Sequence, residues 1–145
     1  TRGRLRILLE AIENSLRTDK SEEAHVQKGL TIEHVMPIAW RQYWELTPAE
    51  IGSELQLAQN RDRIVHTIGN LTLVTKSLNP TLSNWPWIGK QDVKSKRDEI
   101  QENSVLHLNK ILLADAGDQW NESTIESRGR DLAKRACQIW PHCTV

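Results

Sequence analysis

The sequence predicts a mostly helical α+β domain built around a short β-hairpin. Two runs, Leu30 to Val35 and Leu71 to Thr75, are rich in β-branched and apolar residues, which is typical of strands. The longer apolar stretches show the three-to-four-residue spacing of amphipathic helices. A chain of 145 residues can bury one real core and is short for two. We therefore expect a single domain over residues 1–145.

The first half of the chain begins with a predicted helix over residues 2–17, where an apolar stripe runs beside several arginines. The first strand follows, and Pro37 ends it because proline has no N–H for a sheet ladder. Thr47-Pro48-Ala49-Glu50 combines a capping threonine, a first-turn proline and the glutamate of a capping box. It predicts a helix to about Arg61. The β-branched residues of Ile64 to Ile68 indicate extended structure again, so this helix is an insertion between two strands.

Gly69-Asn70 interrupts that run before the second strand begins. A short helix is expected after the second strand, starting at Pro80 with Asn79 as its cap. Ile88 to Asn103 is predicted to be a longer helix. Its basic residues are expected to face mostly outward: Lys90, Lys94, Lys96 and Arg97.

Two more helices are predicted in the last third of the chain. Val105 to Ala114 has helical spacing and ends at Gly117. Ser123-Thr124-Ile125-Glu126 has the pattern of a capping box, and it opens a last helix that Pro141 stops. The chain has six tryptophans and no phenylalanine, so we expect tryptophans to anchor the core. Trp85 and Trp87 are interpreted as core or loop anchors in preference to platforms on which bases stack.

The overall composition excludes several classes of protein. The 19 basic and 19 acidic residues cancel, so any polyanion partner must be recognised by a local cluster of charge. No run of 18 apolar residues exists, so we expect no membrane-spanning segment. Cys137 and Cys143 have neither CxxC spacing nor a histidine pair at zinc-finger spacing. A structural zinc is therefore not expected, and a reduced cytosolic setting is favoured over a local disulfide.

The chemistry is concentrated in Thr31-Ile32-Glu33-His34-Val35-Met36-Pro37, where an acid and an imidazole are neighbours. A neutral histidine can deprotonate water near pH 7, and hard divalent cations prefer oxygen ligands. Glu33, His34, Asn70 and Asn79 supply these groups for phosphodiester cleavage. Neighbours on a regular strand point to opposite faces, so Glu33 and His34 cannot both face one metal unless the strand twists or bulges.

Each of these residues also has a purely structural interpretation. A lone His34 at a strand end is often a hydrogen-bonded structural residue, and Glu33 alone is most often a solvated or salt-bridged acid. Asn70 after Gly69 is a common turn residue, and Asn79 before a proline is a good N-cap. The basic cluster near Lys90 either is a solvated helix face or lies along phosphates.

Three stretches, in this order, resemble the C-terminal nuclease domain of GmrSD-type restriction endonucleases, which also occurs in phosphorothioate-sensing SspE proteins: Thr31 to Pro37, Ile68 to Val74, and Ser77 to Lys90. These enzymes belong to the HNH, or His-Me finger, superfamily. The resemblance implies a ββα-metal core at about residues 30–90, with an inserted helix and with helical flanks at 1–29 and 91–145. It also implies that the chain is the C-terminal piece of a larger protein.

The resemblance assigns roles to individual residues. His34 corresponds to the general base, and Asn70 to the residue that shapes the hairpin loop and orients the base. Glu33 and Asn79 correspond to ligands of one divalent ion, Mg²⁺ or an ion such as Mn²⁺. Lys90 is a looser match to a phosphate-contacting lysine. The nucleic-acid-binding candidates are Lys90, Lys94 and Arg97.

The expected function is a metal-dependent DNA endonuclease, nicking or cleaving, of a bacterial anti-phage restriction system. The implied partners are phage or modified DNA and an N-terminal sensor or NTPase-like region of the same parent protein, in the bacterial cytoplasm. One alternative is a non-catalytic DNA-binding or protein-interaction module with a degenerate HNH fold. Another alternative is an RNase.

Overall fold

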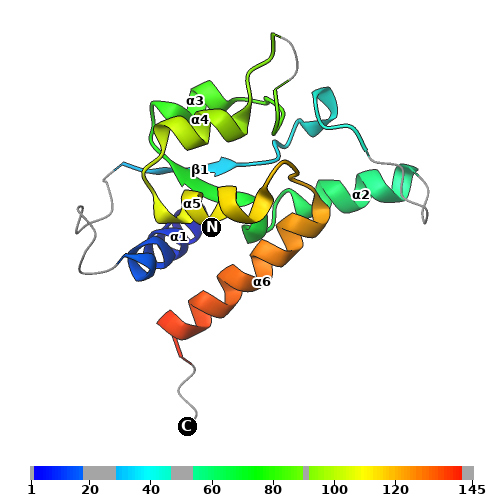
Figure 1. Cartoon of the computed structure of the whole chain (residues 1–145). Coiled ribbons are helices and arrows are strands. Elements are labelled where there is room, and N and C mark those ends of the chain that lie inside the picture. The colour runs from blue at the N-terminus through cyan, green and yellow to red at the C-terminus, as the bar shows by residue number, and fades with distance from the viewer. Residues whose placement is uncertain (1, 18–28, 47–53, 90–91, 142–145) are drawn as a thin grey trace.

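The computed structural model describes residues 2–17, 29–46, 54–89 and 92–141. Its helices and strands are α1 (Arg2–Leu16), β1 (Thr31–His34), α2 (Glu54–Ile64), β2 (Leu71–Val74), α3 (Leu78–Leu82), α4 (Lys96–Asn103), α5 (His107–Ala116) and α6 (Glu122–Ile139). Short 3₁₀ helices cover Trp40–Gln42 and Ile68–Asn70. The predicted α+β class with mostly helical content is confirmed (Figure 1). Within these ranges, no helix has the length and apolar character needed to cross a membrane.

The two strands form an antiparallel pair although α2 lies between them in sequence. Their register places Glu33 opposite Thr72 and His34 opposite Leu71. Residues directly opposite share one face of an antiparallel pair, and neighbours alternate between faces. The hairpin therefore has one face that carries Glu33 and Thr72 and another that carries His34 and Leu71.

Helices cover both faces of this hairpin, so it lies inside the fold. The His34 face packs through Ile32, Leu71 and Leu73 into a cluster with buried residues of α1 and α6, among them Leu9, Ile12 and Leu132. The opposite face packs into a second cluster. Its members include Val74, Leu78, Leu82, Ile100 and Leu112, from β2, α3, α4 and α5. Figure 1 shows α3 and α4 on one side of β1 and α1 and α6 on the other.

The segment before β2 packs directly on α6. A Cβ atom at Gly69 would lie 2.0 Å from the backbone oxygen of Ile125, so this approach requires glycine. The buried Arg128 of α6 donates from Nη1 to the carbonyls of Gly69 (2.7 Å) and Leu71 (2.8 Å). These contacts fix the start of β2 against the longest helix.

The tryptophans follow the prediction in part. Four are buried: Trp40, Trp44, Trp87 and Trp120. Trp85 is half-buried, and Trp140 is 52% exposed. Thus the core is anchored by tryptophan, as predicted, except at the end of α6. Cys137 is exposed, while Cys143 lies outside the described residues.

Three predicted elements were wrong in their position. Ile64 to Ile68 is not extended: α2 ends at Ile64 and a 3₁₀ helix begins at Ile68. Asn79 is not a helix cap, because α3 begins at Leu78 and the Leu78 N–H donates to the Thr75 hydroxyl at 3.2 Å. The last helix is capped by Asn121, which exchanges hydrogen bonds with Thr124 in a reciprocal box.

The helix predicted over Ile88 to Asn103 starts only at Lys96. Ser95 is its cap and accepts from the Asp98 N–H. The backbone N–H of Lys96 donates to the Pro86 carbonyl at 2.9 Å, which is not the partner it would have inside a longer helix. The start predicted at Thr47 to Glu50 lies outside the described residues.

Candidate active site

The four residues expected to carry chemistry lie on or against the β1–β2 hairpin, but they do not all share a face. Glu33 is buried at 9% exposure, whereas His34, on the opposite face, is partly exposed. The alternation expected of a regular strand is therefore present. Glu33 faces α4, and His34 faces the turn that follows α2.

Glu33 forms a buried ion pair with Lys96. The Lys96 Nζ atom donates to Glu33 Oε1 at 2.6 Å and to the His34 carbonyl at 2.8 Å. Burial raises the pKa of Glu33 and lowers the pKa of Lys96, and the attraction between the two charges opposes both shifts. The prediction that Lys96 faces outward was wrong, because this lysine is 0% exposed.

His34 is a partly buried imidazole with a second imidazole beside it. The His66 ring lies edge-on, with 5.9 Å between the ring centroids. Neither His34 ring nitrogen makes a hydrogen bond with the described residues. Burial, and then the positive charges of His66, Arg2 and Lys96, lower the pKa of His34 to about 4. The ring is therefore neutral at pH 7, with a lone pair available to accept a proton.

Asn70 holds the chain that follows His34. Its Oδ1 accepts from the Met36 N–H (2.8 Å) and from Trp120 Nε1 (3.0 Å). Its Nδ2 donates to the carbonyls of Met36 (2.8 Å) and Val65 (2.9 Å). The Asn70 carbonyl also accepts from the Val35 N–H at 3.0 Å. Because the side chain is 0% exposed and has no free valence, it acts as a clamp rather than as a ligand.

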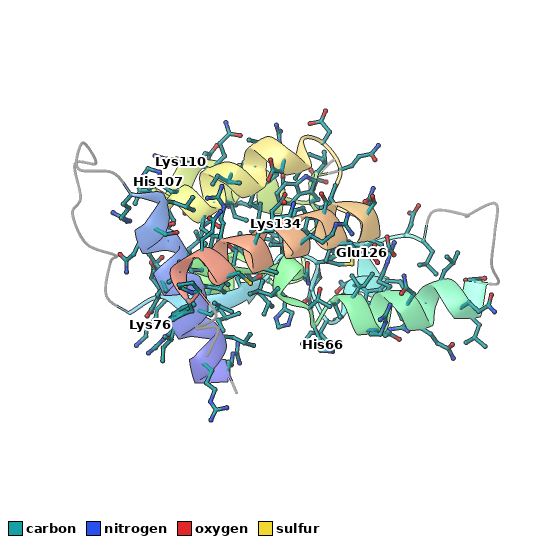
Figure 2. The ribbon with its side chains drawn as sticks, turned by 90° about the horizontal axis from the view of Figure 1, so that it is seen from below. His66, Lys76, His107, Lys110, Glu126 and Lys134 are labelled. Atoms are coloured by element: carbon teal, nitrogen blue, oxygen red, sulfur yellow. The ribbon has the colours of Figure 1, made fainter. Side chains whose placement is uncertain are left out.

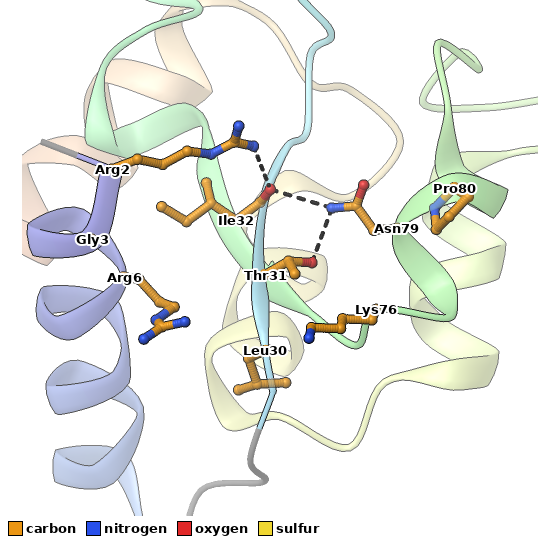
Figure 3. A pocket seen from close by; sticks show the side chains of 9 residues that line it. All are labelled: Arg2, Gly3, Arg6, Leu30, Thr31, Ile32, Lys76, Asn79 and Pro80. Atoms are coloured by element: carbon orange, nitrogen blue, oxygen red, sulfur yellow. Dashed lines mark hydrogen bonds between the residues drawn. The ribbon is translucent and has the colours of Figure 1, made fainter.

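Asn79 lies on the Glu33 face of β1. Its Nδ2 donates to Thr31 Oγ1 at 3.2 Å and to the Ile32 carbonyl at 3.3 Å. Thr31 and Glu33 are two residues apart on the strand, so they share a face. Figure 3 shows the Asn79 oxygen pointing away from Lys76 and from the two hydrogen bonds. That oxygen accepts no hydrogen bond from the described residues, which leaves it available to a ligand.

The donors present suit one hard divalent cation with few protein ligands. Glu33 offers a carboxylate and Asn79 a free amide oxygen on the same face of β1. Among the described residues, no cluster of three or more His, Cys, Asp or Glu residues could hold a metal. Mg²⁺ is commonly held by one or two carboxylates together with water and substrate phosphate, so two oxygen donors are compatible with it. The Lys96 ammonium, which donates to Glu33 Oε1, competes with a metal ion for that carboxylate oxygen.

The basic residues predicted to contact nucleic acid are engaged with neighbours. Lys94 pairs with Glu99 at 3.0 Å and lies 5.3 Å from the centre of the Trp85 ring. Arg97 is half-buried, 4.0 Å from Asp98 and 3.8 Å from Asp118. Lys90 lies outside the described residues.

Sequence reasoning missed two residues of this site, Lys96 and Arg2. Lys96 pairs with Glu33, which is 63 positions away in sequence, and Arg2 donates to the carbonyl of Ile32, which is 30 positions away. No local pattern marks such long-range partners.

The family model for the C-terminal domain of GmrSD restriction endonucleases matches residues 1–135. No curated protein and no solved structure matched the chain. The family match covers most of the chain, including the hairpin, the Asn70 clamp and Asn79. The chain therefore belongs to the family of the C-terminal domains of GmrSD restriction endonucleases.

Proposed function

We propose that this chain is a metal-dependent DNA endonuclease domain of the HNH, or His-Me finger, type, with His34 as the general base. The observation that carries the proposal is a neutral imidazole, free of hydrogen bonds to the described residues, at the end of a strand whose continuation is clamped by Asn70. It occurs in a chain of a restriction endonuclease family. The hairpin and α3 correspond in this proposal to the ββα core.

The surroundings of His34 support a role as base toward a phosphate. The charged groups that keep its pKa low also create a positive potential, which attracts a phosphodiester. A neutral imidazole can accept the proton of a water molecule, and the attacking oxygen then reaches phosphorus. The Asn70 side chain hydrogen-bonds both the N–H and the carbonyl of Met36. The backbone after His34 is therefore held in one conformation. Fixed placement of the base is worth a large part of the rate.

Glu33 and Asn79 are the proposed ligands of one divalent ion, Mg²⁺ or Mn²⁺. When bound, such an ion neutralises charge on the scissile phosphate and on the leaving oxygen. The free Asn79 oxygen and the Glu33 carboxylate are the chain's own contribution on that face. Lys96 holds the carboxylate in position through Oε1.

One observation favours a different class, a non-catalytic DNA-binding module with a degenerate HNH fold. The Lys96 ammonium already neutralises Glu33 in a buried pair, as a structural salt bridge does. In that case Glu33 serves stability, and no metal is needed.

A plasmid nicking assay with Mg²⁺ or Mn²⁺ separates the two functions. We expect relaxation of supercoiled DNA by the wild-type chain, its loss in EDTA, and a rate at least about 100-fold lower in His34→Ala, since a general base contributes roughly that factor or more. His107→Ala, which removes a histidine on α5 outside the site, is the matched control and should cleave normally.

Cleavage that continues unchanged in His34→Ala overturns the assignment of the base. The absence of cleavage with either metal supports the non-catalytic module. The same assay on an RNA of equal length tests for an RNase, which would degrade the RNA and leave the plasmid intact.

The wider setting is part of the same proposal. The whole chain forms one nuclease domain, about residues 30–90 being its core, at the C-terminal end of a larger bacterial cytoplasmic protein. Phage or modified DNA is the substrate. The choice of target lies with an N-terminal sensor or NTPase-like region, and the domain described here supplies the cleavage.

A further inference from the structure

A groove beside the candidate site is lined by cations. It lies between α1, β1 and α3 and has a volume of about 560 Å³ (Figure 3). The residues of this basic groove that the argument uses are Arg2, Arg6, Thr31, Ile32, Lys76 and Asn79. None of the described residues that line it is acidic, although the whole chain has a net charge of zero. The groove therefore concentrates positive charge.

The cations of the basic groove are only weakly engaged. Lys76 is exposed and makes no ion pair or hydrogen bond with the described residues. Arg6 is about half exposed and lies 3.4 Å from Glu10 on the same helix, a surface pair that contributes little. Arg2 reaches the Ile32 carbonyl at 3.5 Å. All three side chains can turn toward an anion without breaking a buried contact.

The basic groove is continuous with the candidate site. Both Arg2 and Asn79 contact the Ile32 carbonyl, one from each side of β1 (Figure 3). Ile32 precedes His34 by two residues, which is about 7 Å along a strand. Arg2 and Arg6 lie one helical turn apart, about 6 Å along α1, so they can reach different phosphates. The arrangement suits a chain of phosphates better than one isolated anion.

We propose that the basic groove binds backbone phosphates of the DNA strand next to the bond that lies at His34. This inference rests on the proposed function, and it gives phosphate binding to Arg2, Arg6 and Lys76 instead of to the region of Lys90, Lys94 and Arg97. Lysine and arginine contacts to phosphates position a duplex without reading its sequence. The groove therefore fixes the register of the substrate and leaves sequence choice open.

The test is the salt dependence of DNA binding in EDTA, where cleavage cannot interfere. Fluorescence anisotropy of a labelled duplex measures the association constant at several salt concentrations. Each phosphate contact makes the slope of log K against log salt more negative by about 0.9. We expect the double variant Arg6→Gln/Lys76→Gln to make the slope less negative by about 2. The single variant Lys76→Gln should make it less negative by about 1 and serves if the double variant fails to fold.

The matched control is Lys110→Gln/Lys134→Gln, which removes the same charge from α5 and α6 (Figure 2). It should leave the slope close to that of the wild type. Equal slopes in the groove variant and the control overturn the proposal, whether both are lowered or neither is. Circular dichroism confirms that each variant is folded.

The nicking assay keeps this result distinct from the proposed function. A wild-type chain that cleaves DNA while the groove variants bind like the control refutes the groove and leaves the endonuclease in place. A wild-type chain that never cleaves, but whose binding depends on Arg6 and Lys76, supports the groove and refutes the endonuclease.

Discussion

Two asparagines of this chain have opposite roles in its architecture. Asn70 is 0% exposed, and its amide makes four hydrogen bonds to Val65, Met36 and Trp120. Asn79 is half-buried and uses only its nitrogen, which leaves the oxygen free beside the basic groove. The same side chain thus builds a loop in one place and remains available to a ligand in the other. Substitutions in the two regions should accordingly separate loss of fold from loss of function.

The largest effect is expected where the Asn70 region meets α6. Gly69→Ala would place a Cβ atom 2.0 Å from the Ile125 carbonyl oxygen, so α6 or the loop must shift. We expect a loss of about 4 kcal/mol or more in the free energy of unfolding, measured by urea denaturation.

Gly129→Ala is the matched control on the other side of this contact. Its Cβ would lie 3.6 Å from Gly69 Cα, an ordinary contact, and alanine is favoured over glycine in a helix by about 1 kcal/mol. We expect stability within about 1 kcal/mol of the wild type. Similar losses in both variants would mean that the close approach at Gly69 is not what holds α6 to the loop.

The next largest effect separates the two asparagines. Asn70→Ala leaves the N–H of Met36, Nε1 of Trp120 and two carbonyls without partners in the core, which should cost about 3 kcal/mol. Asn79→Ala removes two longer bonds at a partly exposed site and should cost less than about 1 kcal/mol. Thermal unfolding measures both.

The nicking assay should give a different contrast for the same pair. Asn79→Ala should stay folded and lose cleavage. In Asn70→Ala, the loss of cleavage should follow from the smaller fraction of folded protein and from the displaced backbone after His34. If Asn79→Ala cleaves like the wild type, its free oxygen is not a metal ligand.

The sequence predicted the hairpin well and its surroundings less well. β-branched residues and Pro37 are local signals, and the strands at Thr31–His34 and Leu71–Val74 follow them closely. The start of α4 at Lys96 depends instead on tertiary contacts. The Ser95 hydroxyl donates to the Trp87 carbonyl at 2.7 Å. The spacing of apolar residues does not report such a contact.

The same division applies to the candidate site. Residue type, spacing and resemblance predicted four site residues: His34, Glu33, Asn70 and Asn79. Glu33 and His34 lie on β1, and Asn70 lies directly before β2. Their partners were not found, because the meeting of Glu33 with Lys96 and of His34 with His66 depends on how distant segments pack. Because Lys96 lies in sequence among other basic residues, the pattern predicted a solvent-exposed side chain. Burial of a lysine is a property of the whole fold.

The smallest predicted effect concerns the pH dependence of stability and isolates His34. Its pKa is about 4 in the folded chain and about 6.5 when unfolded, because burial and neighbouring charges disfavour its protonated form. Between these values the unfolded chain binds a proton that the folded chain does not, so this histidine lowers stability as pH falls from about 6.5 to 4. Since the ring is only partly buried, screening by solvent should limit the effect to about 1 kcal/mol.

Urea denaturation at pH 7 and pH 4.5, in EDTA, measures this contribution. His34→Gln should lose less stability over that interval than the wild type, because the titrating ring is gone and the other groups are shared. His107→Gln, on α5, is the control and should follow the wild-type curve. Parallel losses in the wild type and His34→Gln would mean that the imidazole is protonated equally in both states. The base proposed for cleavage would then be charged, and inactive, already below neutral pH.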